Sequence, residues 1–222
     1  MRLTHKTITL QQAICAVRSY NQGIYGKSGR KNLDIDNEGI SIFEQGLSKD
    51  DDKLTMQIGW VGRDYGGTAH SIASKQLPPR IAKAILNEFE EYHKRIIQRL
   101  PLTQLGMPDS EISYFYKPFQ QTLTTEKRTF KNWIVWGTKV WHFLNPKAFQ
   151  IMDSRAKRFY QVSASSDPVS MYADLQRKTR DLLLSHEDWL PELRAADNGN
   201  AWSDLKLWDK VAYEVGNLGV KS

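Results

Sequence analysis

Lys139 and Asp153 are the two residues of this 222-residue chain whose types could do chemistry together. An uncharged lysine amine is a nucleophile, and burial near other cations lowers a lysine pKa in the required direction. Trp136, Trp141 and Phe143 flank Lys139, so we expect it to be buried among them. A carboxylate at a helix N-terminus, as predicted for Asp153, is stabilised in its ionised form and suits a cationic transition state. The ordinary alternatives are a solvated lysine and an aspartate that only caps a helix.

Other chemistries find little support in the residue pattern. The five histidines share no His-x-x-x-His or His/Cys spacing, so we expect no metal. No Gly-x-Ser-x-Gly nucleophile motif occurs, and the single cysteine, Cys15, lies in a predicted amphipathic helix. One cysteine also excludes an internal disulfide and a four-cysteine iron–sulfur cluster. We therefore expect lysine chemistry without a cofactor.

The segment 127–158 is the most basic part of the chain. It holds eight Lys and Arg against one acid, Asp153, a net +7 where the whole chain has +6. Six Phe and Trp are interleaved with these charges, a combination that suits a surface meeting phosphates and bases. We therefore expect DNA as the partner and a contact surface that includes Lys131, Arg155, Lys157 and Arg158. The alternative is a buried aromatic helix with a solvated basic rim.

The middle of this segment predicts a turn at Trp136-Gly137. One continuous helix would place Val135 on its polar side and Gly137 in its interior, where glycine costs about 1 kcal/mol relative to alanine. Two short helices remove both objections, with Thr138 capping the second. The sequence therefore predicts Lys139 in the first turn of that second helix.

Four stretches of this segment of the chain carry a family resemblance: 137–140, 142–146, Phe149 and 151–155. Their order resembles the core of the helix-hairpin-helix DNA glycosylase superfamily, and most closely a compact branch similar to 8-oxoguanine DNA glycosylases. The resemblance covers about a third of the chain, with a weaker similarity at 205–210. In that family a lysine ending the hairpin attacks the sugar C1′ and an aspartate begins the next helix, and Lys139 and Asp153 fall on these positions.

The resemblance implies a DNA glycosylase, with or without lyase activity, that everts a modified or damaged base. It also implies DNA contacts from Gly137, Thr138 and His142. There are departures, because Val135 stands where the hairpin has its first glycine, and Lys139 and Asp153 lie only 14 positions apart. These departures keep open a second function, a non-enzymatic DNA-binding protein of a repair or defence assembly.

The remaining sequence predicts a mostly α fold, a single domain over 1–222 that can divide into lobes 1–126 and 127–222. Capping signals predict helices that begin after Thr9 and Asp167, and a last helix over 203–215 that ends at Gly216. A long apolar stripe predicts one helix from Pro78 to Leu100. Residues 23–53 and 101–126 look mainly irregular, and short alternating runs at 40–43 and 54–60 predict a β-hairpin.

Composition indicates the class of protein, the charge of its partner and its location. The hydrophobic content of 40% and charged content of 25% are those of an ordinary globular chain, and the pI of about 9.3 favours an acidic partner. No apolar run of a signal peptide or a membrane span occurs in the sequence. We therefore expect a soluble cytoplasmic protein with no membrane partner.

Overall fold

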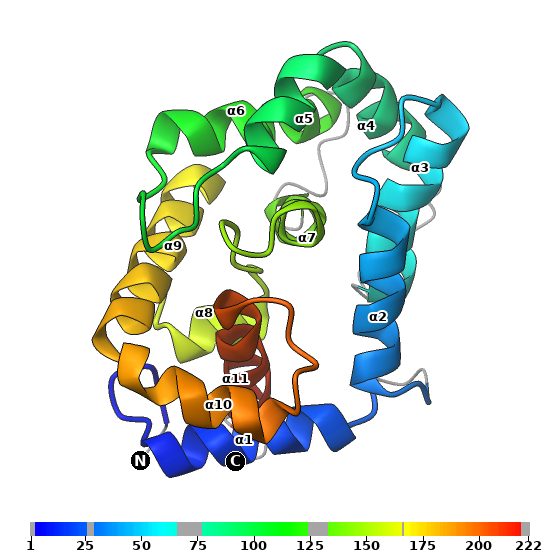
Figure 1. Ribbon diagram of the computed structural model, residues 1–222. Helices are drawn as coiled ribbons and strands as arrows, with labels where there is room; N and C mark the ends of the chain where they lie inside the picture. The colour runs from blue at the N-terminus through cyan, green and yellow to red at the C-terminus, as the bar shows by residue number, and fades with distance from the viewer. Residues whose placement is uncertain (1–2, 26–28, 66–76, 124–132, 166, 219–222) are drawn as a thin grey trace.

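The computed structural model describes residues 3–25, 29–65, 77–123, 133–165 and 167–218. Within these ranges the chain is mostly helical and contains no β-strand, which confirms the mostly α class and shows that the predicted β-hairpin is wrong. Most helices form an open ring around one central helix (Figure 1). Their buried apolar residues form one continuous cluster.

The first helix, α1 (Leu10–Gln22), has the predicted ends. The Thr9 hydroxyl accepts a hydrogen bond from the Gln12 N–H at 3.3 Å, and Gln12 Oε1 accepts one from the Thr9 N–H at 2.9 Å. Gly23 follows the last turn, as expected. These signals lie within a few residues of the helix end, so they operate without tertiary contacts.

Two helices, α2 (Asn32–Phe43) and α3 (Asp51–Trp60), replace the expected loop and hairpin. The Asp50 side chain accepts a hydrogen bond from the Lys53 N–H at 2.9 Å, and Asp51 and Asp52 favour the start of a helix through its dipole. The buried residues of α3 include Leu54 and Ile58, which are four apart. The helical spacing therefore prevails over the alternating pattern. A short π-helical turn, η1 (Val61–Tyr65), follows directly.

The stripe from Pro78 onward is divided between α4 (Leu77–Leu86) and α5 (Phe89–Ile97), so the single long helix is wrong. The chain turns at Glu88, whose N–H bonds the Ile85 carbonyl three residues back at 3.1 Å. The apolar stripe is buried along both helices, but Leu100 is exposed.

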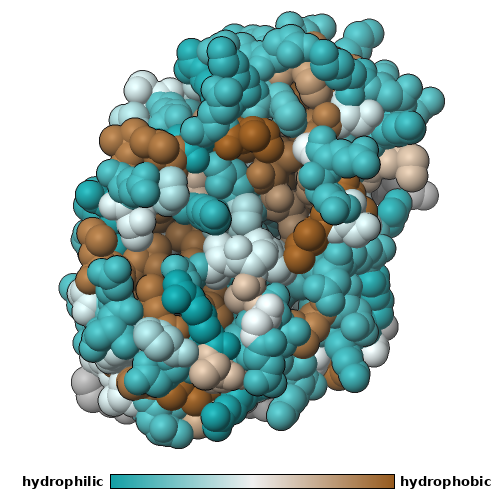
Figure 2. All heavy atoms as spheres, viewed as in Figure 1, coloured by the Kyte–Doolittle hydropathy of each residue, from teal (hydrophilic) through white to brown (hydrophobic). Residues whose placement is uncertain are grey.

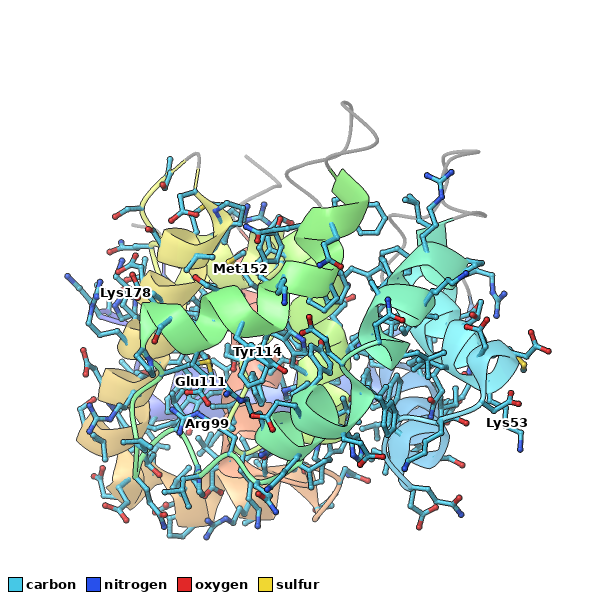
Figure 3. The ribbon with its side chains drawn as sticks, turned by 90° about the horizontal axis from the view of Figure 1, so that it is seen from above. Lys53, Arg99, Glu111, Tyr114, Met152 and Lys178 are labelled. Atoms are coloured by element: carbon cyan, nitrogen blue, oxygen red, sulfur yellow. The ribbon has the colours of Figure 1, made fainter. Side chains whose placement is uncertain are left out.

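Residues 109–123, expected to be irregular, form α6 (Asp109–Leu123). Arg99, just after α5, is buried and pairs with Glu111 of α6 at 2.9 Å, and Figure 3 shows the two residues near each other. The Arg99 guanidinium also donates to the carbonyl of Gly106 at 2.6 Å. These bonds fix α6 so that Phe115 and Phe119 pack against Trp141 in the central helix.

The central helix is α7 (Trp133–Leu144), and it runs without interruption through Gly137. The predicted turn at Trp136-Gly137 is therefore wrong, and Lys139 lies in the helix interior. A Cβ on Gly137 would come within 3.3 Å of the rings of Phe119 and Trp141, so glycine permits close packing that offsets its low helix propensity. Every residue of α7 except Val135 is buried, and Val135 is half-buried. The helix is buried on nearly all sides because other elements surround it, and the buried residues include the polar Thr138, Lys139 and His142.

The chain closes with α8 (Ser154–Phe159), α9 (Pro168–Ser185), a 3₁₀ turn η3 (Glu187–Trp189), α10 (Leu190–Asp197) and α11 (Asp204–Leu218). Asp167 caps α9 as predicted, accepting from the N–H groups of Val169 and Ser170. The last helix packs against α8 and α1, so the two ends of the described chain meet. Gly216 lies inside α11 and does not end it, which corrects that prediction.

Candidate active site around Lys139

Lys139 lies on the central helix α7 with only 5% of its surface exposed. Its side chain lines a small pocket together with Asp153, which precedes α8, and Asp209 of α11. Three ionisable groups from three separate elements therefore meet in one enclosed space. The two residues predicted to act together do share a site.

Hydrogen bonds between neighbouring residues hold Lys139 and Asp153 in this arrangement. The hydroxyl of Thr138, next to Lys139, accepts a hydrogen bond from the N–H of Met152, next to Asp153, at 3.1 Å. Met152 is labelled in Figure 3 and is buried, as is Thr138. The Thr138 hydroxyl also donates to the carbonyl of Val135 at 3.1 Å. This link joins the interior of α7 to the chain entering α8.

Tyrosine rings form much of the pocket wall. The Lys139 amine lies 5.4 Å from the centre of the Tyr65 ring, an arrangement of a cation over an aromatic face. Tyr25 stacks on Tyr65 with centroids 5.9 Å apart and on Tyr213 with centroids 6.4 Å apart. Tyr20 also lines the pocket. The space among these side chains is about 20 Å³, room for about one water molecule.

A second lysine, Lys206 of α11, lies beside the pocket and is fully buried. Its amine is 2.9 Å from Asp36 Oδ1, 3.1 Å from Asp209 Oδ2 and 3.2 Å from the Tyr65 hydroxyl. These partners occupy the three directions in which an ammonium group can donate. Lys206 is therefore held as a cation.

The two lysines differ in the direction of their pKa. Burial lowers the pKa of Lys139, although Asp153 and Asp209 act in the opposite direction. Burial acts on Lys206 as well, but Asp36, Tyr20 and Asp209 outweigh it and raise the pKa of Lys206. In the described part of the chain no hydrogen bond or ion pair joins Lys139 to another side chain. Of these two lysines, Lys139 is the one whose pKa moves in the direction that favours the neutral amine.

Asp153 caps α8, as predicted. Its Oδ1 accepts hydrogen bonds from the N–H groups of Arg155 and Ala156, both at 2.8 Å. Its Oδ2 lies 3.9 Å from Arg155 Nη1. About a fifth of the side chain remains exposed, so this carboxylate can serve both the helix and the pocket.

The aromatic surroundings of Lys139 differ from the expected ones. Trp136 and Trp141 do not line the pocket. The Trp136 indole donates to the Ile58 carbonyl at 2.9 Å, and the Trp141 indole donates to the Tyr92 hydroxyl at 2.8 Å. The rings near Lys139 are tyrosines from distant segments, because neighbours along a helix point in other directions.

The predicted DNA contacts fall into three groups. Gly137, Thr138 and His142 are buried, so their side chains do not reach a partner in this conformation, and a hairpin contact with phosphate is not formed by them. Lys131 lies outside the described residues. Arg155, Lys157 and Arg158 are partly exposed on α8, the helix whose Ala156 lines the pocket.

The sequence did not predict Asp209 and Lys206 as residues of this site, nor Asp36, which pairs with Lys206. A signal was present in α11, where Lys206, Asp209, Lys210 and Tyr213 recur at spacings of three and four. These residues share one helix face, which would normally be taken as the exposed side. Helix α11 packs against both α1 and α8, so that face is enclosed.

Larger hollows lie away from this pocket. A groove of about 1180 Å³ lies among α2, α3 and α4, and another of about 600 Å³ lies among α9, α10 and the start of α11. Figure 2 shows apolar surface in a hollow beside α9. Neither groove contains Lys139, Asp153 or Asp209. Both grooves are larger than the pocket that Lys139 lines, so size does not favour this pocket.

Two further classes of site are absent from the described residues. No group of three or more His, Cys, Asp and Glu there is arranged to hold a metal ion. No helix among them combines the length and apolar character needed to cross a membrane.

Comparison with known proteins gives no match: no family model fits the chain, and no curated protein and no solved structure is similar to it.

Proposed function

We propose that this protein binds DNA and excises a modified or damaged base through attack by Lys139 on C1′ of an everted nucleotide. The observation that carries the proposal is the contrast between Lys139 and the two buried lysines of α11. Lys206 is held among two carboxylates and a tyrosine hydroxyl, and Lys210 pairs with Asp197. Lys139 has a lowered pKa and forms no ion pair among the described residues, although Asp153 and Asp209 line its pocket. A lysine in that condition is suited to nucleophilic catalysis.

The reaction follows from these groups. The amine of Lys139 forms a bond to C1′, and the base leaves with the electron pair of the glycosidic bond and takes up a proton. The new ammonium loses one N–H proton, and the nitrogen lone pair then breaks the bond from C1′ to the ring oxygen, which takes up a proton. The product is a protonated imine between Lys139 and C1′. Asp153, on the pocket wall, stabilises positive charge on the sugar during this step. The imine also permits a lyase step at the same site.

The position of α8 supports DNA as the partner. Lys157 and Arg158 lie on this helix, whose first residues border the pocket. A strand bound along these cations would bring a nucleotide to the tyrosine rings, on which a base can stack. A base is much larger than the present space of about 20 Å³, so it must displace at least one ring as it enters.

Borohydride trapping tests the proposal. An oligonucleotide with an abasic site should form a covalent adduct with the wild-type protein, because borohydride reduces the imine to a stable amine. Lys139→Gln should abolish the adduct, whereas Lys53→Gln should not, since Lys53 lies on the outer side of α3 (Figure 3). Oxidised purines, then uracil and alkylated bases, form the excision panel.

The small volume of the pocket favours the second function, a non-enzymatic DNA-binding protein. A folded wild-type protein that binds DNA but neither traps abasic DNA nor excises any base of the panel would support that function. Lys139 would then be a buried structural residue and Asp153 only a helix cap.

A further inference from the structure

The pocket contains two carboxylates near one reactive amine, and their surroundings differ. Asp153 Oδ1 already accepts hydrogen bonds from two backbone N–H groups, and its Oδ2 lies 3.9 Å from the Arg155 guanidinium. Asp209 is more deeply buried, and each of its oxygens accepts one hydrogen bond. A carboxylate oxygen has two lone pairs, so Asp209 keeps capacity to accept a proton on each oxygen.

We infer that Asp209 accepts the proton that Lys139 releases when its amine attacks an electrophilic carbon. The inference rests on the proposed function, and it gives Asp153 and Asp209 separate roles: charge stabilisation and proton acceptance. In the step, the amine lone pair forms the new nitrogen–carbon bond. One N–H proton of the resulting ammonium passes to the Asp209 carboxylate, which leaves a neutral amine and a neutral carboxylic acid.

Two neighbours fix the Asp209 carboxylate in the pocket wall. The Gln150 amide donates to Oδ1 at 3.1 Å, and Lys206 donates to Oδ2 at 3.1 Å. Gln150 is itself held by Gln176, whose side-chain oxygen accepts the Gln150 N–H at 3.1 Å. Gln150 and Lys206 are therefore positioning residues, since they act through Asp209.

The protonation properties of Asp209 agree with this role. Burial raises its pKa, and the nearby Asp153 charge acts in the same direction, while Lys206 opposes both. Two titratable groups whose surroundings move their pKa values toward each other exchange a proton more readily. The pocket also has room for about one water molecule, enough for a relay between the two side chains.

Several charged or titratable groups surround Lys139, and each could affect its titration. They come from every element that packs around the pocket: Tyr20 of α1, Tyr65 of η1, Asp153 and Arg155 at α8, and Lys206 and Tyr213 of α11, in addition to Asp209. An experiment must therefore separate proton acceptance by Asp209 from its effect as a fixed charge.

Reductive methylation with formaldehyde and excess cyanoborohydride makes this separation without DNA. Labelling of Lys139 is measured on its peptide by mass spectrometry, relative to Lys157 on the surface of α8 in the same sample. If Asp209 were only a fixed negative charge, Asp209→Asn would lower the Lys139 pKa and speed its labelling at neutral pH. If Asp209 accepts the proton, Asp209→Asn should slow labelling of Lys139 by at least about tenfold, because general-base effects are typically about 100-fold or more.

Asp197→Asn is the matched control. Asp197 is a buried carboxylate that pairs with Lys210, and it does not line the pocket. Its removal should leave the labelling ratio of Lys139 to Lys157 unchanged. Faster or unchanged labelling in Asp209→Asn would overturn the inference, and so would a wild-type Lys139 that is not labelled.

The pH profile of the wild-type protein gives a second measurement, which decides the matter if Asp209→Asn does not fold. The logarithm of the labelling rate should rise with a slope of about one per pH unit where only Lys139 must lose a proton. Below the pKa of Asp209 this slope should increase toward about two, because the Asp209 carboxyl must then lose a proton as well. A slope of about one over the whole pH range would overturn the inference. If labelling of Lys139 shows these effects but borohydride traps no adduct with abasic DNA, the proposed function alone would be refuted.

Discussion

Gly216 of α11 packs directly against the backbone of Arg155 at the start of α8. A Cβ on Gly216 would lie 2.6 Å from the Arg155 carbonyl oxygen and 2.8 Å from its Cα. The Arg158 side chain also joins the two helices, because its Nε donates a hydrogen bond to the Gly216 carbonyl at 2.9 Å. This glycine sets the distance between the helix that carries Asp209 and the helix that Asp153 caps.

Gly216→Ala should therefore destabilise the protein by about 1–3 kcal/mol, because the backbone of α8 must shift to admit the methyl group. Gly59→Ala is the control, since a Cβ there would meet only Pro78 at 3.9 Å. That variant should be neutral or gain up to about 1 kcal/mol from the better helix propensity of alanine. Urea denaturation measures both. Equal midpoints for the two variants would contradict the proposed role of the contact.

Asp153→Asn should keep DNA binding and slow base excision, because it removes the charge and retains an N-cap side chain. Asparagine caps helices about as well as aspartate, so stability should change by less than about 1 kcal/mol. Asp167→Asn makes the same change at the start of α9, outside the pocket. Excision should be slowed only in Asp153→Asn, as measured by single-turnover kinetics on folded samples. Equal slowing in both variants would assign the effect to helix capping.

His142 should make the protein sensitive to acid. Burial lowers its pKa to about 3, and its Nδ1 lies 2.7 Å from the Phe149 carbonyl. The unfolded chain takes up a proton near pH 6.5 and the folded protein only near pH 3, so stability falls as the pH decreases between these values. The loss amounts to roughly 3–5 kcal/mol. His142→Asn, whose amide can donate to the same carbonyl, should flatten the curve of unfolding free energy against pH. A slope equal to that of the wild type would exclude His142 as the cause.

Lys157 and Arg158 on α8 should contribute to DNA affinity through phosphate contacts. Replacing both with glutamine should reduce the slope of log K against log salt by about 1.8, because about 0.9 is expected for each phosphate contact. Lys53→Gln removes a charge on α3, which lies apart from α8 in Figure 1, and should leave the slope unchanged. Fluorescence anisotropy over a range of salt concentrations measures these slopes. A normal slope in the double variant would move the DNA contact away from α8.

The sequence alone determined the features that depend on neighbouring residues. Thr9, Asp153 and Asp167 cap the helices predicted for them, since a cap bonds backbone groups only two or three residues away. The mostly α class followed from the same local signals. The approach of Lys139 and Asp153 was predicted through the family resemblance, and the pocket contains both.

The surroundings of these residues depend on long-range packing. Helix α7 stays continuous because other elements enclose it on nearly every side, so Lys139, Thr138 and His142 are buried without following an apolar stripe. Lys206 and Asp209 are acceptable inside the protein because Asp36 and Gln150, distant in the sequence, bond to them. A buried charge requires partners, and long-range packing alone determines whether those partners are present.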